Sequence, residues 1–203
     1  MRNRTASIAS ATRTGMRYEI RPSLTGDYDA VADLIEARLS ALGDRSADAL
    51  DVERTSVLDH VGKRVSERPV VWLLCRGAEV VACAAVRVGT PAWGWWPRQL
   101  AEAALHVSVF TDPERRHERL SRFVVWWALD YAWRLGQEGG PQIRWVRGST
   151  DSEAVMRLAR DEAGFAALPG VSGGRHAFLL QRAPQEMGRL RSFLASRQTG
   201  LVR

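Results

Sequence analysis

The stretch "PERRHERLSRFVVWWALDYAWRLG", from Pro113 to Gly136, decides how the rest of the chain is interpreted. Its second part has the apolar spacing of a single helix. Its first seven residues include three arginines, a histidine and two glutamates, directly after an apolar, strand-like run. The start of a helix offers unpaired backbone amides and the positive end of the helix dipole. The stretch therefore predicts an anion-binding site; the alternative is a helix start whose charges are simply solvated.

The 203-residue chain has the length of one domain, with 45% hydrophobic and 26% charged residues, as in soluble globular proteins. No apolar run approaches the roughly 20 residues needed to span a bilayer. The formal charge of +6 lies at the ends: residues 1–17 carry +4 and residues 182–203 carry +4, so the middle carries −2. This distribution argues against a basic globular face for nucleic acid. Arginine-rich tails could still touch RNA or DNA weakly, but solvated tails are favoured.

Three segments are expected along the chain. Residues 1–16 form a basic, flexible tail, residues 17–183 the folded domain, and residues 184–203 an amphipathic helix with a basic tail. The first segment is not a secretory signal, because it lacks a continuous apolar run. Its composition resembles a transit peptide, but disorder is the simpler interpretation, and Met16 is a candidate natural start.

Two cysteines, Cys75 and Cys83, lie in apolar runs on either side of the turn "RGAE". Pairing across this turn would place Cys75 near Val80 and Cys83 near Trp72, so the thiols would not face each other. We therefore expect no disulfide. Reduced, core-forming thiols are typical of a cytoplasmic protein.

The order of elements predicts a mixed sheet with helices on both faces, an α/β arrangement. Strands are expected at residues 18–23, 70–75, 80–89, 103–111, 142–148 and 174–182. Helices are expected from Asp27 to Gly43, from Val52 to Arg68, up to Gly136, from Ser152 to Ala163, and over residues 184–197.

This order, with two details, resembles the GNAT superfamily of N-acyltransferases. The first detail is "YEIRPSLTGDYDAVADLI", which is similar to the family's opening strand, its Ile-Arg-Pro and the Asp that starts the first helix. The second is the opening stretch, in which Pro113, Glu114, Arg116 and Gly136 fall in register with the family pattern. The resemblance covers about residues 17–182 and implies a GNAT-like mixed central sheet flanked by helices on both faces.

The resemblance implies a site for acyl-coenzyme A. In the family, main-chain amides of the strand before the loop meet the acyl carbonyl, and the loop with the helix N-terminus holds the pyrophosphate. Carried over residue by residue, the coenzyme-binding positions are Val109, Phe110, Thr111, Arg116, His117, Glu118, Arg119, Leu120 and Ser121. No metal ion is implied.

The loop departs from the family pattern, which is Arg or Gln, two residues, Gly, one residue, then Gly or Ala. Arg119 and Ser121 replace the two glycines, and His117 replaces a further glycine that is often present. A non-glycine residue in a left-handed conformation costs about 1 kcal/mol. The Arg119 side chain would either fill the phosphate space or supply a cation. Glu118 adds a negative charge unless it points away.

The catalytic residues also depart from the family. The tyrosine that protonates the leaving thiolate would stand at Arg160, and a frequent asparagine at Glu153. Because a thiol has a pKa of about 8.5, its thiolate is a good leaving group and needs little general-acid catalysis. His106 is the candidate general base, on the same strand face as Ser108; the alternative is a core histidine with satisfied hydrogen bonds.

Three tryptophans, Trp93, Trp95 and Trp96, lie in the loop that precedes the predicted coenzyme strand. By resemblance this region lies near the acceptor, so an aromatic acceptor pocket or lid is one interpretation. Simple packing of a long loop is the other. The tryptophans in helices and strands are expected to be core residues.

The sequence therefore predicts a cytoplasmic acyltransferase that moves an acetyl or related acyl group from acyl-coenzyme A to an amine of a small molecule or protein. The alternative is a catalytically inactive GNAT-fold binding or assembly module. The expected partners are acyl-coenzyme A and an unidentified amine acceptor, and the chain could form a homodimer. Neither a membrane nor a nucleic acid is expected as a partner.

Overall fold

The computed structural model describes residues 18–42, 47–91, 94–168, 178–188, 190 and 194–196. An eight-stranded sheet with the order β10-β1-β4-β5-β6-β7-β9-β8 forms its centre. The strands are β1 (Tyr18–Pro22), β4 (Val71–Arg76), β5 (Glu79–Val88), β6 (Ala104–Thr111), β7 (Trp145–Thr150), β8 (Ala166–Leu168), β9 (Phe178–Arg182) and β10 (Leu194–Ser196). The pairs β1–β10 and β6–β7 are parallel and the others antiparallel. The predicted mixed α/β sheet is confirmed.

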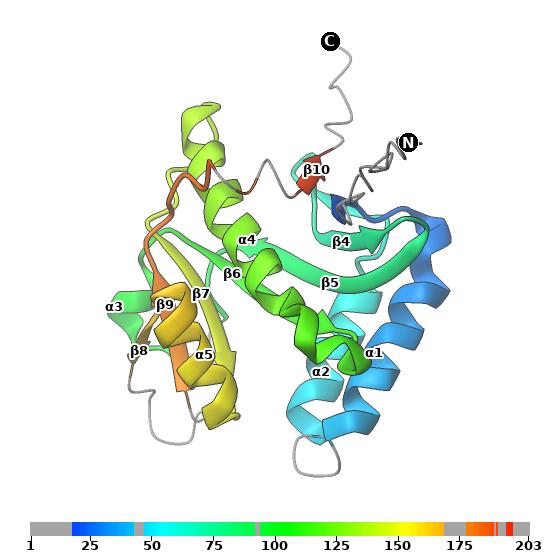
Figure 1. Cartoon of the computed structure of the whole chain (residues 1–203). Helices are drawn as coiled ribbons and strands as arrows, with labels where there is room; N and C mark the ends of the chain where they lie inside the picture. The colour runs from blue at the N-terminus through cyan, green and yellow to red at the C-terminus, as the bar shows by residue number, and fades with distance from the viewer. Residues whose placement is uncertain are drawn as a thin grey trace, which may run out of the picture.

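Helices cover both faces of the sheet (Figure 1). The helices α1 (Tyr28–Leu42) and α2 (Ala47–Leu58) lie on one face, and α4 (Leu120–Gln137) and α5 (Glu153–Ala163) on the other. Successive strand residues point to opposite faces, so Cys83 of β5 joins the α1/α2 core while Ala84 joins the α4/α5 core. Because both faces are covered, the central strands are apolar without polar alternation.

The first strand and first helix are joined by an ion pair. Arg21 of β1 donates to both carboxylate oxygens of Asp27, at 2.7 and 2.8 Å. The Asp27 carboxylate also accepts the backbone N–H of Leu24 at 2.7 Å and so holds the short 3-10 turn η1 (Thr25–Asp27) that leads into α1. Asp27 thus lies one residue before α1 begins, and the predicted stop at Gly43 lies outside the described residues.

The predicted helix from Val52 to Arg68 is wrong in both bounds. Its helix, α2, spans Ala47–Leu58, and a two-stranded hairpin of β2 (Arg64–Val65) and β3 (Arg68–Pro69) follows. Gly62 has a φ of +72°, and a Cβ there would come within 2.5 Å of the Thr25 nitrogen. Positive φ at Ser66 and Glu67 then turns the chain back. Backbone turns therefore end the helix where the apolar pattern suggested continuation.

The predicted helix over residues 184–197 is wrong at both of its described ends. Residues 183–187 have no regular secondary structure, Leu190 is helical, and residues 194–196 form β10, which lies parallel to β1 with Tyr18 opposite Leu194. The Met187 backbone N–H donates to the buried Asp130 carboxylate of α4 at 2.9 Å. An open sheet edge and a buried acceptor on α4 outweigh the helical spacing of the apolar residues.

The cysteine prediction is confirmed with a small change of register. Cys75 pairs with Val80 as predicted, but Cys83 lies opposite Leu73, because the pairing shifts between Leu74 and Cys75. Both thiols are free and buried in the α1/α2 core. Burial raises the pKa of Cys75, and it raises that of Cys83 to about 12, so neither is a reactive thiolate.

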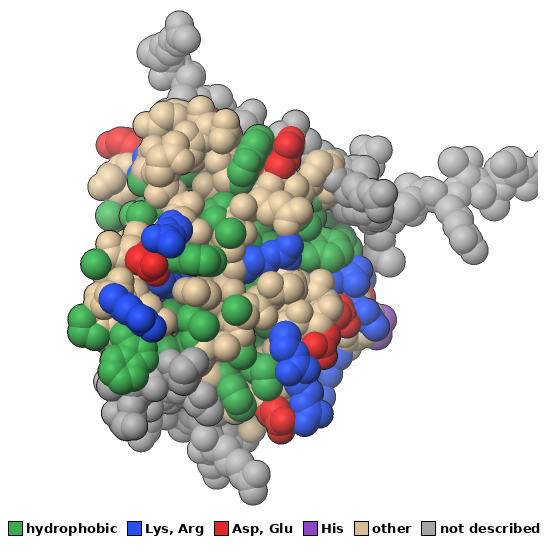
Figure 2. Space-filling view, turned by 90° about the vertical axis from the view of Figure 1, so that its left-hand side faces the viewer, with side chains coloured by type: hydrophobic (Ala, Val, Ile, Leu, Met, Phe, Trp, Pro, Cys, Tyr) green, Lys and Arg blue, Asp and Glu red, His purple; other side chains and the backbone are tan. Residues whose placement is uncertain are grey.

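Charges on the described surface are mixed. Figure 2 shows one side of the molecule, on which basic and acidic side chains lie beside one another among apolar ones. On α5, Arg157 pairs with Glu153 and Arg160 with Asp161. No helix in the described part of the chain is long and apolar enough to cross a membrane. The expected tail of residues 1–16 lies outside the described residues.

Candidate functional site

The strands β6 and β7 part in the middle of the sheet. They pair at three positions, the last of which joins His106 to Arg147. Beyond it, β6 stays paired with β5 as far as Thr111, and β7 stays paired with β9 as far as Thr150. In the described residues no β6–β7 pair follows His106, so the facing backbone groups of the two strands border a gap.

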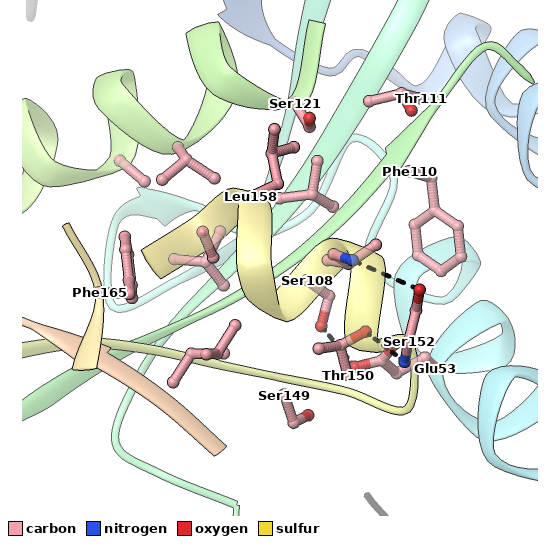
Figure 3. A pocket seen from close by; sticks show the side chains of 18 of the residues that line it. Glu53, Ser108, Phe110, Thr111, Ser121, Ser149, Thr150, Ser152, Leu158 and Phe165 are labelled. Carbon is pink, nitrogen blue, oxygen red and sulfur yellow. Dashed lines mark hydrogen bonds between the residues drawn. The ribbon is translucent and has the colours of Figure 1, made fainter. Parts of the chain in front are cut away.

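A cavity of about 250 Å³ occupies this gap (Figure 3). It passes through the sheet, because its lining comes from helices on both faces. On one side it reaches Ser121 of α4 and Leu158 of α5, and on the other Arg38 of α1 and Glu53 of α2. Its walls between them are residues 107–111 of β6 and 146–150 of β7. Two molecules entering from opposite faces would meet at the parted strands.

The predicted strand residues Val109, Phe110 and Thr111 all line this cavity. The Phe110 side chain packs in the α1/α2 core and also borders the cavity (Figure 3). Alternate backbone groups of β6 point away from β5 in an antiparallel pair. Here they point toward the gap.

The predicted phosphate loop forms a short 3-10 segment, η3 (Pro113–Glu118), followed by Arg119 and then α4. Arg119 has φ 52° and ψ 41°, the left-handed conformation for which the family uses glycine. The chain therefore makes this turn with a non-glycine residue, whose left-handed conformation costs about 1 kcal/mol of stability. Asp112 supports the loop by accepting the Glu114 N–H and the Arg115 side chain, both at 2.9 Å.

Glu118 points away from the helix start. Its carboxylate accepts the Tyr18 hydroxyl of β1, Arg115 at 3.1 Å and Arg76 of β4 at 3.3 Å. The hydrogen bond from Tyr18, supported by the two arginines, lowers the pKa of Glu118. Burial and the Glu118 carboxylate raise the pKa of Tyr18 to about 12. The negative charge that sequence reasoning placed in the loop is thus neutralised beside the sheet.

The rest of the loop is divided between surface, core and cavity. Arg116 and His117 are exposed, and Leu120 is buried in the α4/α5 core. Arg119 is 57% exposed and bonds Glu162 of α5 at 3.1 Å. Of the six predicted loop residues, Ser121 lines the cavity, at the second position of α4.

His106 lies beside the cavity but does not line it. It is 7% exposed and stands in register between Arg87 of β5 and Arg147 of β7. Its role as a base stays a prediction. Ser108, on the same face two residues on, does line the cavity, and its hydroxyl donates to the Glu53 carboxylate at 2.9 Å (Figure 3).

Four charged residues line the cavity that were not predicted as site residues: Arg38, Glu53, Arg147 and Asp151. Glu53 carried no motif that could have marked it. Arg38 did carry a signal, because it occupies a position with the same helical spacing as the core residues Val31, Leu34 and Ile35. An arginine on the apolar stripe of a helix has a side chain directed inward. Burial and the nearby Arg116 guanidinium lower the pKa of Arg38.

Arg147 fixes the loop before β6 to the sheet. Its guanidinium is fully buried and donates to Thr90 at 2.9 Å, to the carbonyl of Gln99 in α3 (Pro97–Leu100), and to Glu102. It also stacks on the Trp95 ring, at 4.6 Å from the ring centroid. Desolvation lowers the pKa of Arg147, whereas Glu102 favours its charged form.

The loop tryptophans do not line the cavity within the described residues. Trp95 is buried under Arg147, Trp96 is 44% exposed, and Trp93 lies outside the described residues. The packing interpretation therefore accounts for Trp95. The position of the missing tyrosine, Arg160, is exposed and bonded to Asp161. In the described residues no group of three or more His, Cys, Asp or Glu side chains could hold a metal ion.

No protein-family model matches the sequence, and no curated protein matches it. Solved structures do match the fold. A GNAT-family acetyltransferase from Listeria monocytogenes superposes with a TM-score of 0.61 at 15% identity, over 84% of this chain and 96% of that chain. A GNAT-family acetyltransferase from Streptococcus agalactiae gives 0.58 at 15% identity, over 83% and 96%.

The PaiA N-acetyltransferase from Thermoplasma acidophilum, solved in complex with coenzyme A, gives a TM-score of 0.59 at 13% identity, over 83% of this chain and 99% of that chain. At such identities the likeness concerns the fold. The chain spans nearly the whole length of each of these structures. This protein has the GNAT acetyltransferase fold.

Proposed function

We propose that this protein is an N-acyltransferase that moves an acetyl or related acyl group from acyl-coenzyme A to an amine. One observation carries the proposal: the parted strands β6 and β7 open into a cavity that crosses the sheet and reaches the start of α4. Such a cavity gives two substrates separate entrances and one meeting point. Positioning an amine against a thioester supplies much of the rate in acyl transfer.

The residues around the start of α4 fit a pyrophosphate. The left-handed Arg119 gives the backbone turn that glycine provides elsewhere, so the helix N-terminus remains accessible beside the cavity. Glu118 is held away by Tyr18 and Arg76. Arg116 and Arg119 supply cations at the surface. In opposition, Glu162 already bonds Arg119, so a phosphate would have to compete for this guanidinium.

Bound acyl-coenzyme A would supply an activated acyl group as a thioester. Amide groups of Val109 to Thr111 would orient the acyl carbonyl from the open edge of β6. The amine nitrogen forms the new C–N bond as the C–S bond breaks; one proton leaves the nitrogen, and the released thiolate takes up one proton. Since a thiolate leaves readily, the lack of tyrosine at Arg160 does not prevent this chemistry.

The competing function is a binding or assembly module that uses the same fold without catalysis. The Arg119–Glu162 pair and the missing tyrosine favour this alternative. The two are separated by asking whether the cavity takes acyl-coenzyme A and whether the bound thioester is consumed. If the protein is an enzyme, adding an amine releases free coenzyme A thiol from the bound thioester. If it is a binding module, no thiol is released.

Thermal unfolding with a series of acyl-coenzyme A compounds tests the proposal. A ligand at 100 times its dissociation constant stabilises the folded state by about 2.7 kcal/mol, which raises the Tm of a chain of this size by roughly 5–10 °C. We expect such a shift with acetyl-coenzyme A or a related acyl chain. If millimolar acetyl-, malonyl- and long-chain acyl-coenzyme A all leave Tm unchanged, the enzyme proposal is wrong.

A further inference from the structure

The cavity lining includes the cation Arg38 and two carboxylates, Glu53 and Asp151. Arg38 lines the cavity from α1, and Glu53 lines it from α2. Within the described part of the chain, no carboxylate pairs with the Arg38 guanidinium, and the like charge of Arg116 acts on it. A half-buried cation without a counter-ion is costly, and such a group marks a place for an anionic ligand.

Glu53 is oriented by the sheet. Its Oε1 accepts the Ser108 hydroxyl at 2.9 Å, and Ser108 lies beyond the last β6–β7 pair, where the strands have parted. A carboxylate offers about four acceptor positions, and the Ser108 hydroxyl occupies one of those of Glu53. The Glu53 carboxylate is therefore fixed beside the proposed meeting point of acyl group and amine.

We propose that the acceptor is a small zwitterion: an amine that also carries an anionic group, with its ammonium on Glu53 and its anion on Arg38. The inference rests on the proposed function, because it assigns the acceptor side of the same cavity. The ammonium is placed where the carboxylate of Glu53 can accept the proton that the nitrogen loses. The anion neutralises Arg38, for which a guanidinium offers a paired set of N–H donors.

The size and charge of the cavity narrow the class further. A volume of about 250 Å³ must hold both the acyl end of one substrate and the reactive end of the other. That leaves space for a small group on each side. A purely cationic polyamine would place a second positive charge near Arg38 and Arg116, which disfavours it. Either a carboxylate or a phosphate on the acceptor could pair with Arg38, and the first experiment distinguishes these two anionic groups.

The first experiment uses matched amines with acetyl-coenzyme A and follows free thiol release. α-Amino acids and their amides, which lack the carboxylate, form one pair of arms. O-phosphoethanolamine and ethanolamine, which lacks the phosphate, form the other. We expect at least one amine with an anionic group to have a kcat/KM tenfold or more above that of its partner without the anion. The arm in which this occurs identifies a carboxylate or a phosphate. Equal turnover of the two members of both pairs would overturn the zwitterion proposal while leaving acyltransfer intact.

The second experiment assigns the anion to Arg38. Arg38→Gln should raise KM for the amine with an anionic group tenfold or more and leave KM for acetyl-coenzyme A within about twofold. KM for the matched amine without the anion should not change. Arg64→Gln is the control, since Arg64 is an exposed arginine of β2 that does not line the cavity. If Arg38→Gln instead raises KM for acetyl-coenzyme A, the residue belongs to the coenzyme side and the proposal is wrong.

A binding measurement covers the case in which turnover is too slow to follow. Coenzyme A without an acyl group should raise Tm, and an anionic amine should raise it further in the native protein but not in Arg38→Gln. An additional shift that is the same in both proteins would contradict the assignment. If coenzyme A itself gives no shift, the proposed function fails, and the acceptor assignment fails with it.

Discussion

The Tyr18 hydroxyl of β1 donates a hydrogen bond to the Glu118 carboxylate in the loop before α4. This bond connects the first strand to the residue just before the left-handed Arg119, 100 positions along the chain. It joins the strand next to the β10 edge of the sheet to the loop that we propose as a phosphate site. Removing it should therefore affect both stability and coenzyme binding.

Tyr18→Phe removes the hydroxyl and keeps the ring that packs against Phe123. We expect a loss of about 1 kcal/mol in the free energy of unfolding, or about 2–4 °C in Tm. The affinity for acetyl-coenzyme A should fall several-fold, because Glu118 loses one of the groups that hold it away from the helix start. Tyr28→Phe is the control, since Tyr28 is an exposed residue of α1. Equal effects of both substitutions would contradict this role for Tyr18.

The same pair predicts a dependence on alkaline pH. The pKa of Tyr18 is raised from 10 to about 12, so the folded state holds this proton more tightly than the unfolded state. The contribution to stability is complete below pH 10 and is lost as pH rises toward 12. Urea unfolding should show the native protein losing stability over this range more steeply than Tyr18→Phe. Parallel pH profiles would rule out the contribution.

Two substitutions test whether Arg119 contributes to coenzyme binding: one reverses its charge, and the other removes the charge together with the backbone strain. Arg119→Glu should weaken acetyl-coenzyme A binding tenfold or more without unfolding the protein, because the side chain is mostly exposed. Arg119→Gly removes the charge but relieves about 1 kcal/mol of left-handed strain, so its net effect on affinity should be small. If Arg119→Gly creates binding that the native chain lacks, the loop is a blocked phosphate site and the fold serves a non-catalytic purpose.

Glu53 and His106 make different predictions for the proton that the amine loses. Glu53→Gln should lower kcat by about 10²-fold or more, the usual range for loss of a general base. His106→Asn should lower Tm, because His106 is buried, and leave kcat within a few-fold. Steady-state kinetics with purified proteins of equal folded fraction decide this. A large loss of kcat in His106→Asn alone would confirm the histidine and refute Glu53.

Much of the fold could be predicted because many of its helices and strands have clear local sequence patterns. The hairpin of β4 and β5 follows from two apolar runs around a turn, and α4 from its spacing and length. The C-terminal segment could not be predicted this way. Its apolar spacing fits a helix, but the open edge of β1 and the buried Asp130 decide its conformation. Both partners are distant in sequence.

The candidate site was predictable where a sequence pattern fixes backbone geometry. The strand that contains Val109 to Thr111 was predicted from its apolar run, and the question of a left-handed Arg119 came from its position at a family glycine. Glu53 was not, because its carboxylate reaches the cavity only through the packing of α2 against β6. Arg38 was visible as an arginine at a core spacing, but its unpaired state depends on which side chains surround it in space.

The central claim is that the start of α4 and the gap between β6 and β7 bind acyl-coenzyme A. Isothermal titration of acetyl-coenzyme A into the native protein and Ser121→Glu tests it most directly. Ser121 lines the cavity at the second position of α4. A glutamate at this position interacts favourably with the helix dipole but repels a pyrophosphate. We predict saturable one-to-one binding to the native protein and its loss in Ser121→Glu, with Tm unchanged or higher. No binding to the native protein, or equal binding to both, would contradict the account.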